Sequence, residues 1–238
     1  MTLPGFEEWI KREGFVKIFS YWSINEEQAP QGTEGILILS KVPCTATYGV
    51  GVEGFDRQAR VVTLEFPEIF IIISYNPQGG LKSHSLEYRA KWEKSFEEFL
   101  KGMKEKSERT GKKIIWAGDF NVNPEEGDFS ERAFDNIRHK IPRGTIPAGC
   151  REEDRQAYRR MVEAIEGKNL GDVFGRNRTW FPNEFCLQKN FGQRIDHVVA
   201  QQQLLDSGGP IQIQNFAVAK EFGGGRRFVQ ITAHYGSG

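Results

Sequence analysis

The sequence has little of what would place it in a specialised class of protein. Its 238 residues include only three cysteines, Cys44, Cys150 and Cys186, which lie far apart without metal-ligand spacing. A scattered, odd set of this kind argues against a disulfide framework and favours a reducing compartment. The longest apolar run, IFIIIS at 69–74, is too short to span a bilayer, and the first residues lack a signal-peptide hydrophobic region. We therefore expect a protein of the cell interior without membrane insertion, with the nucleus and the mitochondrion both left open.

Net charge is also lacking, because Lys plus Arg and Asp plus Glu number 32 each. A nucleic-acid-binding domain is usually basic, so the balance gives no overall sign of such binding, although a local basic patch is compatible with a neutral total. A hydrophobic content of 38% with 18 Phe and 5 Trp argues against disorder. The length suits one domain with a substantial core, and we predict a single α/β domain over residues 1–238.

Periodicity predicts where strands and helices lie. Short β-branched runs bounded by Pro, Gly and charged residues predict strands at 35–41, 59–66, 69–74 and 112–118, with two or three closing strands around 194–201, 211–219 and 227–235. Apolar residues at three- and four-residue spacing predict helices over 86–103, capped by Ser85, and over 151–167. Residues 128–150 read as irregular.

Two polar residues follow the strand at 112–118, in the segment WAGDFNVNP. Asp119 and Asn121 stand one residue apart, where a carboxylate can take a proton or a cation and an amide can donate to a phosphate oxygen. The same pair is typical of an Asx-turn at a strand end. The residues alone leave both interpretations open.

Other polar residues carry weaker signals. Tyr75 ends a strand, where it could donate to a phosphate or simply lie at a rim. Asp196, two residues after Arg194, could orient a catalytic imidazole or form a strand-edge ion pair. The four histidines show no metal-ligand spacing, which favours structural or surface roles. Arg226 and Arg227, in FGGGRRF, could contact phosphate or lie in a solvated hairpin loop.

Several motifs occur together in one order. They are GTEGILILSKVP, FDRQARVVTLEF, SYNPQGG followed by LEYRAKWEKSFEEFLK, GDFNVNPEEGD and KNFGQRIDHVVA. Together they resemble the exonuclease III-like apurinic/apyrimidinic (AP) endonucleases of DNA base excision repair, over nearly the whole chain. The resemblance implies a DNase I-like fold, a four-layer sandwich of two mixed β-sheets flanked by helices, here lacking the first strands.

The resemblance also implies roles for four residues. Tyr75 falls on the tyrosine that contacts the scissile phosphate, and Asp119 on the aspartate that positions or activates the attacking water. Asn121 falls on its phosphate-binding neighbour, and Asp196 on the aspartate that orients the catalytic histidine. In active members Mg²⁺ polarises the phosphate and stabilises the leaving oxygen.

The chain departs from the family at both ends. It begins after the Asn-x-Asn/Asp-Gly strand and the Gln-Glu-Thr/Ser-Lys strand, whose Glu is the principal metal ligand, so no residue is assigned as a metal ligand. Arg226, Arg227 and Phe228 stand where the family has Ser-Asp-His, and Gln78 and Gln193 replace a family Asn and Trp. A forced alternative alignment puts Ala233 and His234 on Asp-His, which keeps the histidine and still loses the aspartate.

These departures predict a catalytically inactive relative that serves as a structural or nucleic-acid-associated subunit of a larger complex, an organellar one among the options. No cofactor is expected under this hypothesis. The alternative is an active Mg²⁺-dependent AP endonuclease, completed by another chain or by a missing N-terminal segment. A phosphatase of the wider superfamily is a third reading. Because the absent strands would leave an unpaired edge, we also expect a protein partner that covers it, with DNA or RNA as a further partner.

Overall fold

The computed structural model describes residues 5–24, 34–80, 83–132, 146–206, 211–218 and 229–235. Its strands are β1 (Lys17–Trp22), β2 (Gly35–Ser40), β3 (Thr45–Tyr48), β4 (Val61–Glu65), β5 (Ile69–Tyr75), β6 (Lys113–Asp119), β7 (Gly167–Asn169), β8 (Asp196–Gln201), β9 (Ile211–Val218) and β10 (Val229–Tyr235). Its helices are α1 (Phe6–Arg12), α2 (Glu53–Asp56), α3 (Ser83–Thr110), α5 (Glu152–Ala164), α6 (Leu170–Phe174) and α7 (Glu184–Gln188), with 3₁₀ turns η1 (Glu126–Asp128) and η3 (Gln202–Leu204).

A six-stranded sheet in the order β3-β4-β5-β6-β8-β7 forms the centre of the molecule. Strands β5 and β6 are parallel, while the other neighbours in this sheet pair antiparallel. A parallel pair needs a crossover connection, and the 28-residue helix α3 supplies it. As a result β5 and β6 end at the same edge of the sheet, side by side with the start of β8.

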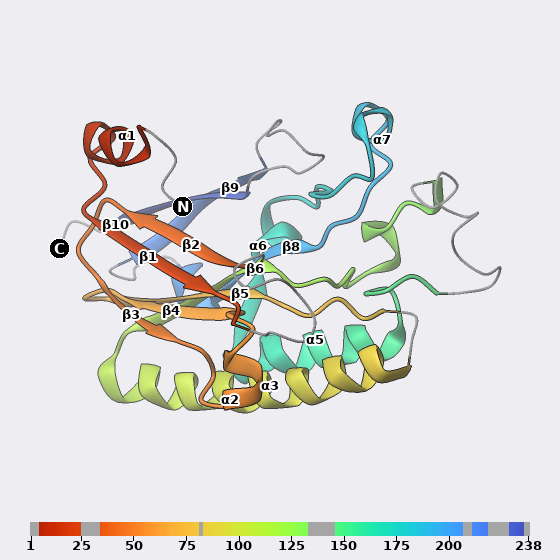
Figure 1. Ribbon diagram of the computed structural model, residues 1–238, viewed down its shortest axis with the longest axis horizontal. Helices are drawn as coiled ribbons and strands as arrows, with labels where there is room; N and C mark the ends of the chain where they lie inside the picture. Colours follow the sequence, from red (N-terminus) through yellow and green to blue (C-terminus); the bar gives the residue numbers. More distant parts are fainter. Residues whose placement is uncertain are drawn as a thin grey trace.

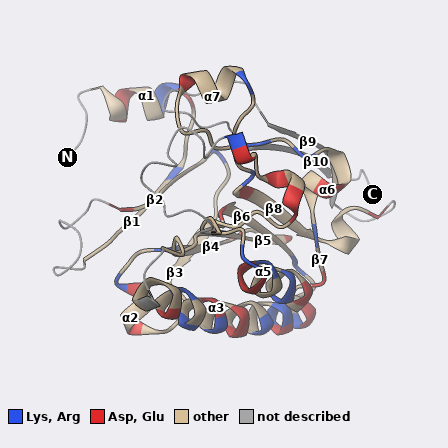
Figure 2. Ribbon diagram, turned by 90° about the vertical axis from the view of Figure 1, so that its right-hand side faces the viewer, with Lys and Arg blue, Asp and Glu red and all other residues tan. Residues whose placement is uncertain are grey.

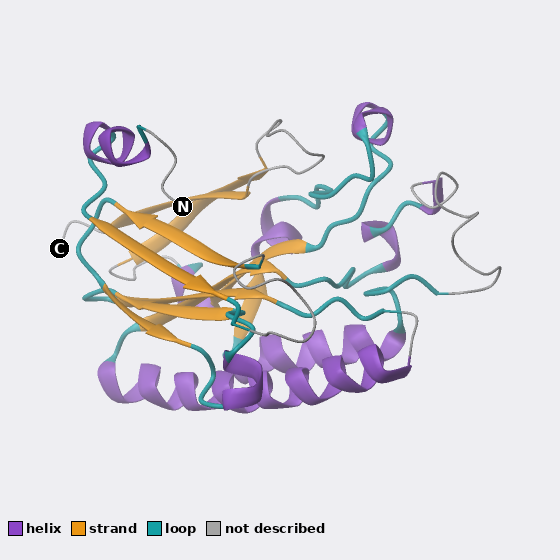
Figure 3. Ribbon diagram, in the orientation of Figure 1, coloured by secondary structure: helices purple, strands orange, loops and turns teal. Residues whose placement is uncertain are grey.

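The two faces of this sheet are covered differently (Figure 1). Helices α3 and α5 lie along one face, where Phe70, Ile72 and Trp116 pack against Trp92 and Phe96 of α3. Alternate strand residues point to the other face, as the two-residue period of a strand requires. That second face is covered by strands, as Figure 3 shows by colour.

Two antiparallel hairpins, β1–β2 and β9–β10, make up this second strand layer. Ile36 and its neighbours in β1–β2 pack on Val62 and Leu64 of β4, whereas Ile213 of β9 packs on Ile115 of β6 and Val198 of β8. Helix α1 lies beyond the hairpins, on the side away from α3 (Figures 1 and 2).

The predicted α/β fold with strand layers flanked by helices is thereby confirmed. In the described part of the chain the second layer consists of two separate hairpins, and only the six-stranded sheet is mixed.

Several predicted boundaries differ from the structure. The helix placed at 86–103 runs from Ser83 to Thr110, so Ser85 lies inside it and does not cap it. Its last turns are polar but are tied by i,i+4 ion pairs such as Lys104–Glu108, which periodicity of apolar residues does not detect. The helix placed at 151–167 ends at Ala164, because Glu166 takes a positive φ of 50°.

The sequence prediction missed the first helix and strand. Strand β1 alternates between exposed and half-buried residues, and α1 buries only Ile10 among its residues, so neither shows a continuous apolar signal. Much of the segment predicted to be irregular, residues 133–145, lies outside the described residues. Among the helices that are described, none combines the length and apolar character needed to cross a membrane.

Candidate active site

Three of the predicted site residues form one row across the central sheet. Tyr75 at the end of β5 is paired in register with Asp119 at the end of β6, and Asp119 is paired with Asp196 at the start of β8. Directly paired residues of neighbouring strands carry their side chains on the same face. The sequence spreads these residues over more than a hundred positions, and the pairing of β5, β6 and β8 brings them together.

The row faces the hairpin layer and not the helices. In β5 the residues Phe70, Ile72 and Ser74 alternate with Tyr75 and are buried, the first two against α3. Ile115 of β6 and Val198 of β8, on the same faces as the two aspartates, pack in the cluster that includes Ile213 of β9. All three site residues are half-buried.

Asp119 and Asn121 are joined by a tight turn. The Asn121 amide donates to Asp119 Oδ1 at 3.0 Å, and Asn121 has a positive φ of 48°. Asparagine tolerates this conformation better than most residues. The Asn121 side chain donates from Nδ2 to the carbonyl of Asn76 at 2.9 Å, which ties the turn to the segment after β5. The Asx-turn interpretation is therefore confirmed, and the turn fixes where both side chains lie.

A cation lies against the tyrosine of the row. The Arg60 guanidinium is 5.0 Å from the centre of the Tyr75 ring, and its Nη1 donates to the Tyr75 carbonyl at 3.2 Å. Cation–π contact and hydrogen bond together hold a positive charge beside the phenol.

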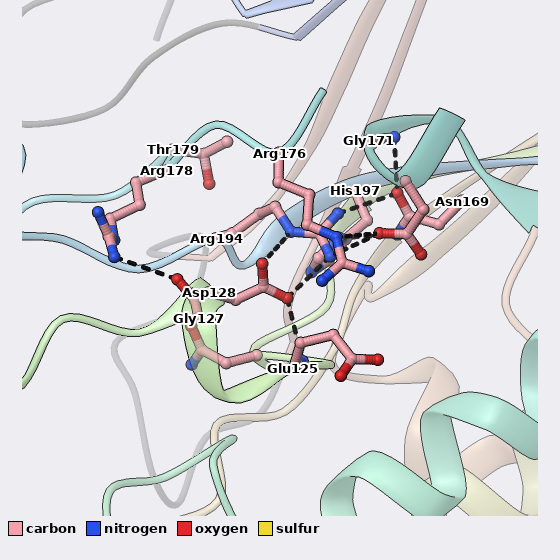
Figure 4. A network of polar contacts seen from close by, with 12 residues as sticks. Glu125, Gly127, Asp128, Asn169, Gly171, Arg176, Arg178, Thr179, Arg194 and His197 are labelled. Atoms are coloured by element: carbon pink, nitrogen blue, oxygen red, sulfur yellow. Dashed lines mark hydrogen bonds and ion pairs between the residues drawn. The ribbon is translucent and has the colours of Figure 1, made fainter. Parts of the chain in front are cut away.

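The expected ion pair between Asp196 and Arg194 is wrong. Arg194 donates to both carboxylate oxygens of Asp128 at 2.8 Å (Figure 4). Its Nη2 also lies 3.1 Å from Asp172. Arg194 precedes β8, and its amide donates to the Asp128 carbonyl, which places it beside η1. The Asp196 amide instead donates to Thr179 Oγ1 at 3.1 Å.

His197 follows Asp196 but lies on the opposite, helix-facing side of β8. It packs against Phe120 and Tyr158 and is buried, and its Nε2 is 3.0 Å from the Val122 carbonyl. Burial, assisted by the nearby Arg194 charge, lowers the pKa of His197 from the usual 6.5 to about 3. His197 is therefore a neutral structural imidazole and does not face the row of site residues.

Sequence reasoning missed the buried polar residues that support this edge. Asn76 and Asn123 are almost fully buried, and Asn123 Nδ2 donates to Gln193 Oε1 at 2.9 Å. Asp128 and Thr179 were missed as well, although they hold Arg194 and Ile195, the two residues just before β8, in place. A partner that is distant in the chain leaves no local pattern in the sequence. The position of these four residues close to turns was therefore the only sign of their role.

The two arginines predicted to contact phosphate, Arg226 and Arg227, lie outside the described residues. Within the described ranges no group of three His, Cys, Asp or Glu residues is placed to hold a metal ion. Asp119 and Asp196 are nevertheless opposite each other on one face. Two carboxylates suit a cation that shares its coordination with water and substrate phosphate, which is how Mg²⁺ is usually bound.

Known proteins match the chain over most of its length. The model of the Endonuclease/Exonuclease/phosphatase family matches residues 5–213. The chain is 28% identical to the DNA repair nuclease APEX1 of Danio rerio over 84% of its own length and 61% of that protein. It is 31% identical to a DNA-(apurinic or apyrimidinic site) endonuclease of Dictyostelium discoideum over 83% of its own length and 52% of that protein.

A solved structure supports the fold. The 3'-5' exonuclease of Neisseria meningitidis superimposes with a TM-score of 0.70 at 19% identity, covering 95% of this chain and 82% of that one. At this identity the likeness shows the DNase I-like fold alone. The chain spans between half and two thirds of the length of the two curated relatives named above.

These relatives overturn the expectation that the chain is not an enzyme. That expectation rested on departures at two motifs, whereas the relatives that match more than four fifths of the chain are a nuclease and an endonuclease. The matching segments include the strands that carry Tyr75, Asp119 and Asp196. The chain belongs to the endonuclease/exonuclease/phosphatase family.

Proposed function

We propose that the protein is a Mg²⁺-dependent nuclease of DNA repair that cleaves the phosphodiester backbone at abasic sites. The observation that carries this proposal is the row of Tyr75, Asp119 and Asp196 on one sheet face, with Asn121 held beside it by the turn. The two curated relatives described above, a DNA repair nuclease and an AP endonuclease, supply the substrate class.

Each residue of the site has a chemical task that its position supports. Asp119 accepts the proton of the attacking water, since a half-buried carboxylate that solvent can reach can act as a general base. Asn121 uses one side-chain N–H on the Asn76 carbonyl and keeps a second N–H to donate to a phosphate oxygen. Tyr75 donates its hydroxyl to the phosphate, with the Arg60 charge beside its ring.

Asp196 completes the acidic side of the site. Its carboxylate lies in register with Asp119, and it would hold Mg²⁺ together with water and a phosphate oxygen of the substrate. When bound, the cation supplies charge stabilisation to the phosphate and the leaving oxygen. We further propose that a segment or chain beyond the described residues adds the remaining metal donor, because the described ones offer no third acidic ligand there.

DNA is the proposed partner. The formal net charge of the protein is zero, so the charge of the whole chain does not attract the DNA backbone. Figure 2 shows acidic and basic residues interspersed along α3 and α5, which matches the zero formal net charge. A nuclease of this kind needs a local basic surface to hold the backbone. The proposal that Arg226 and Arg227 contribute to that surface remains a prediction.

Incision of an oligonucleotide duplex that carries one synthetic abasic analogue tests the function. The purified protein with Mg²⁺ is expected to cut the strand at the analogue and to leave the undamaged duplex intact. Asp119→Asn should lower the rate at least about 10²-fold, the usual effect of losing a general base. Glu98→Gln, which alters an exposed carboxylate of α3, is the matched control and should cut at the wild-type rate.

Two results would overturn the proposal. One is the absence of incision by the wild-type protein with either Mg²⁺ or Mn²⁺. The other is incision by Asp119→Asn as fast as by the wild type, which would place the activity elsewhere or in a contaminant. A parallel reaction on a duplex with a 3'-phosphate end distinguishes phosphatase activity, which the family also includes.

A further inference from the structure

The loop after β6 is held in an unusual way, through its backbone carbonyls. From Phe120 to Asn123 every carbonyl oxygen accepts a hydrogen bond from a side chain that belongs to another element. We call these four residues the Asn121 loop. Because it follows Asp119 directly and contains Asn121, its conformation decides where both side chains of the site point.

Three side chains make these contacts. Arg89 of α3 donates to the Asn121 carbonyl at 2.7 Å and to the Phe120 carbonyl at 3.5 Å. His197 of β8 lies with Nε2 at 3.0 Å from the Val122 carbonyl. Arg155 of α5 donates from Nε to the Asn123 carbonyl at 3.0 Å. Helix α3, helix α5 and the central sheet therefore all meet at this one loop.

Arg89 is itself fixed before it reaches the loop. Only 2% of its side chain is exposed, and its Nε donates to Glu93 at 2.7 Å and lies 3.6 Å from Asp154. The carboxylate of Asp154 also accepts from the Gly149 amide, and the Gly149 carbonyl accepts from the Asn123 amide. The contacts thus close around the loop from both its carbonyl and its amide sides.

His197 is fixed in one tautomer by its neighbours. Asn169 Nδ2 lies 3.0 Å from Nδ1, and an amide nitrogen can only donate, so Nδ1 accepts and the proton resides on Nε2. That proton is then directed at the Val122 carbonyl. His197 follows Asp196 in β8. Its hydrogen bond to the Val122 carbonyl therefore ties the Asn121 loop to the strand that carries Asp196.

The loop has a conformation that needs such support. Asn121 has a φ of 48°, a region that side-chain-bearing residues populate sparsely and that persists where surroundings determine it. Gly149 packs so closely on the loop that a Cβ built there would lie 2.4 Å from the Asn121 carbonyl oxygen. Close packing and hydrogen bonds together restrict the Asn121 loop to this conformation.

We propose that Arg89, Arg155 and His197 are positioning residues that hold Asp119 and Asn121 in the geometry needed for attack on the phosphate. This inference rests on the proposed function and extends it to residues that do not face the substrate. Displacing reacting groups by about 1 Å can cost about 10²-fold in rate. Because these side chains bond to the backbone of the loop and are not part of the row of Tyr75, Asp119 and Asp196, the loss should appear in kcat with KM little changed.

Matched variants separate positioning from general stability. Arg155→Met removes a contact to the loop, whereas Arg159→Met alters an exposed arginine one turn further along the same helix. His197→Phe removes the donor to the Val122 carbonyl, whereas His197→Gln keeps an N–H donor in a side chain of similar reach. Thermal unfolding of each variant confirms that it is folded at the assay temperature.

Two measurements are made on each variant. Amide hydrogen exchange at Asn121 and Asn123 reports on the order of the loop and does not depend on activity. Steady-state incision of the abasic duplex gives kcat and KM. Arg155→Met and His197→Phe should exchange faster and lose about 10²-fold in kcat, while Arg159→Met should match the wild type and His197→Gln should recover most of the loss.

The possible outcomes each decide a different point. Unchanged exchange in both Arg155→Met and His197→Phe overturns the inference, as does faster exchange with an unchanged kcat. A kcat loss in His197→Gln as large as in His197→Phe overturns the role of the donated hydrogen bond. If the wild type does not incise, the proposed function fails together with the catalytic part of this inference, while the exchange rates still decide whether these side chains order the loop.

Discussion

Individual residues at the site are constrained by contacts that the local sequence does not reveal. Asn121 could be assigned to the site from the Asp-x-Asn spacing and from the family motif that contains it. Its bond to the Asn76 carbonyl could not, because that partner lies forty-five residues earlier in the chain, and no local pattern marks its positive φ. The pairing of Arg194 was predicted wrongly for the same reason, since its true partner Asp128 is sixty-six residues away.

No sequence pattern distinguishes His197, yet its surroundings in the fold shift its pKa and so make the stability of the protein depend on pH. Its neighbours are the charged pair Arg194 and Asp128 together with Tyr158, and its pKa falls to about 3 in the folded protein. In the unfolded chain the pKa returns to the usual 6.5. Between these two values the unfolded chain binds a proton that the folded protein does not. The stability that His197 contributes is therefore complete above about pH 6.5 and is lost as the pH falls toward 3.

Urea unfolding at pH 7 and pH 5 tests this linkage. The free energy of unfolding of the wild type should fall between the two by about 2 kcal/mol more than that of His197→Gln, which retains the hydrogen bond without the titration. Equal pH dependence in the two proteins would show that His197 is protonated in the fold or exposed to solvent.

Secondary-structure elements were predicted well where their sequence pattern is local. Strands β5 and β6 and helices α3 and α5 follow from β-branched runs and from apolar spacing. Strand β3 and the hairpin strand β1 were missed, because each buries little of its surface. The row of site residues also could not be predicted from spacing alone, because it depends on the parallel register of β5 with β6.

The contact between η1 and the start of β8 depends on one buried ion pair. Arg194 and Asp128 have side chains that are 3% and 1% exposed. Removing one partner leaves a buried charge uncompensated, so Arg194→Met should lower the free energy of unfolding by about 3–5 kcal/mol. Arg176→Met, which breaks a half-exposed pair with Asp172, should cost less than about 1 kcal/mol.

Urea unfolding of Arg194→Met, Asp128→Asn and the double variant Arg194→Met/Asp128→Asn, with Arg176→Met as the control, measures the pair. The double variant has no buried charge left at this point and keeps an acceptor for the Glu125 amide. Its loss of unfolding free energy should therefore be smaller than the sum of the losses in the two single variants. Additive losses would mean that the two side chains contribute independently, contrary to their bidentate contact.

At the scale of the whole molecule, the two strand layers are unequal. The central sheet is covered by helices on one face, whereas the outer face of the β1–β2 hairpin carries exposed apolar side chains. Phe19 and Tyr21 point inward, and Ile18 and Trp22 alternate with them outward at 50% and 47% exposure. Leu37 on β2 is 47% exposed and lies opposite Ser20 on the same outer face.

This surface has the properties of an association site. Exposed apolar patches and strand edges without a neighbouring strand both favour contact with another chain, and among the described residues β1 and β2 pair only with each other. We predict that the purified protein self-associates through this face, with a second copy of the chain as the partner. Leu37→Lys and Ile18→Lys should each shift the equilibrium toward the monomer, because a charge there would have to be buried in the interface.

Sedimentation velocity over a range of protein concentrations measures this equilibrium. Val173→Lys, a substitution of an equally exposed apolar residue on α6, is the matched control and should leave the association constant unchanged. If the wild type sediments as a monomer at every concentration, the hairpin face does not bind a second copy. If Val173→Lys and Leu37→Lys dissociate the protein equally, added charge and not loss of this face is the cause.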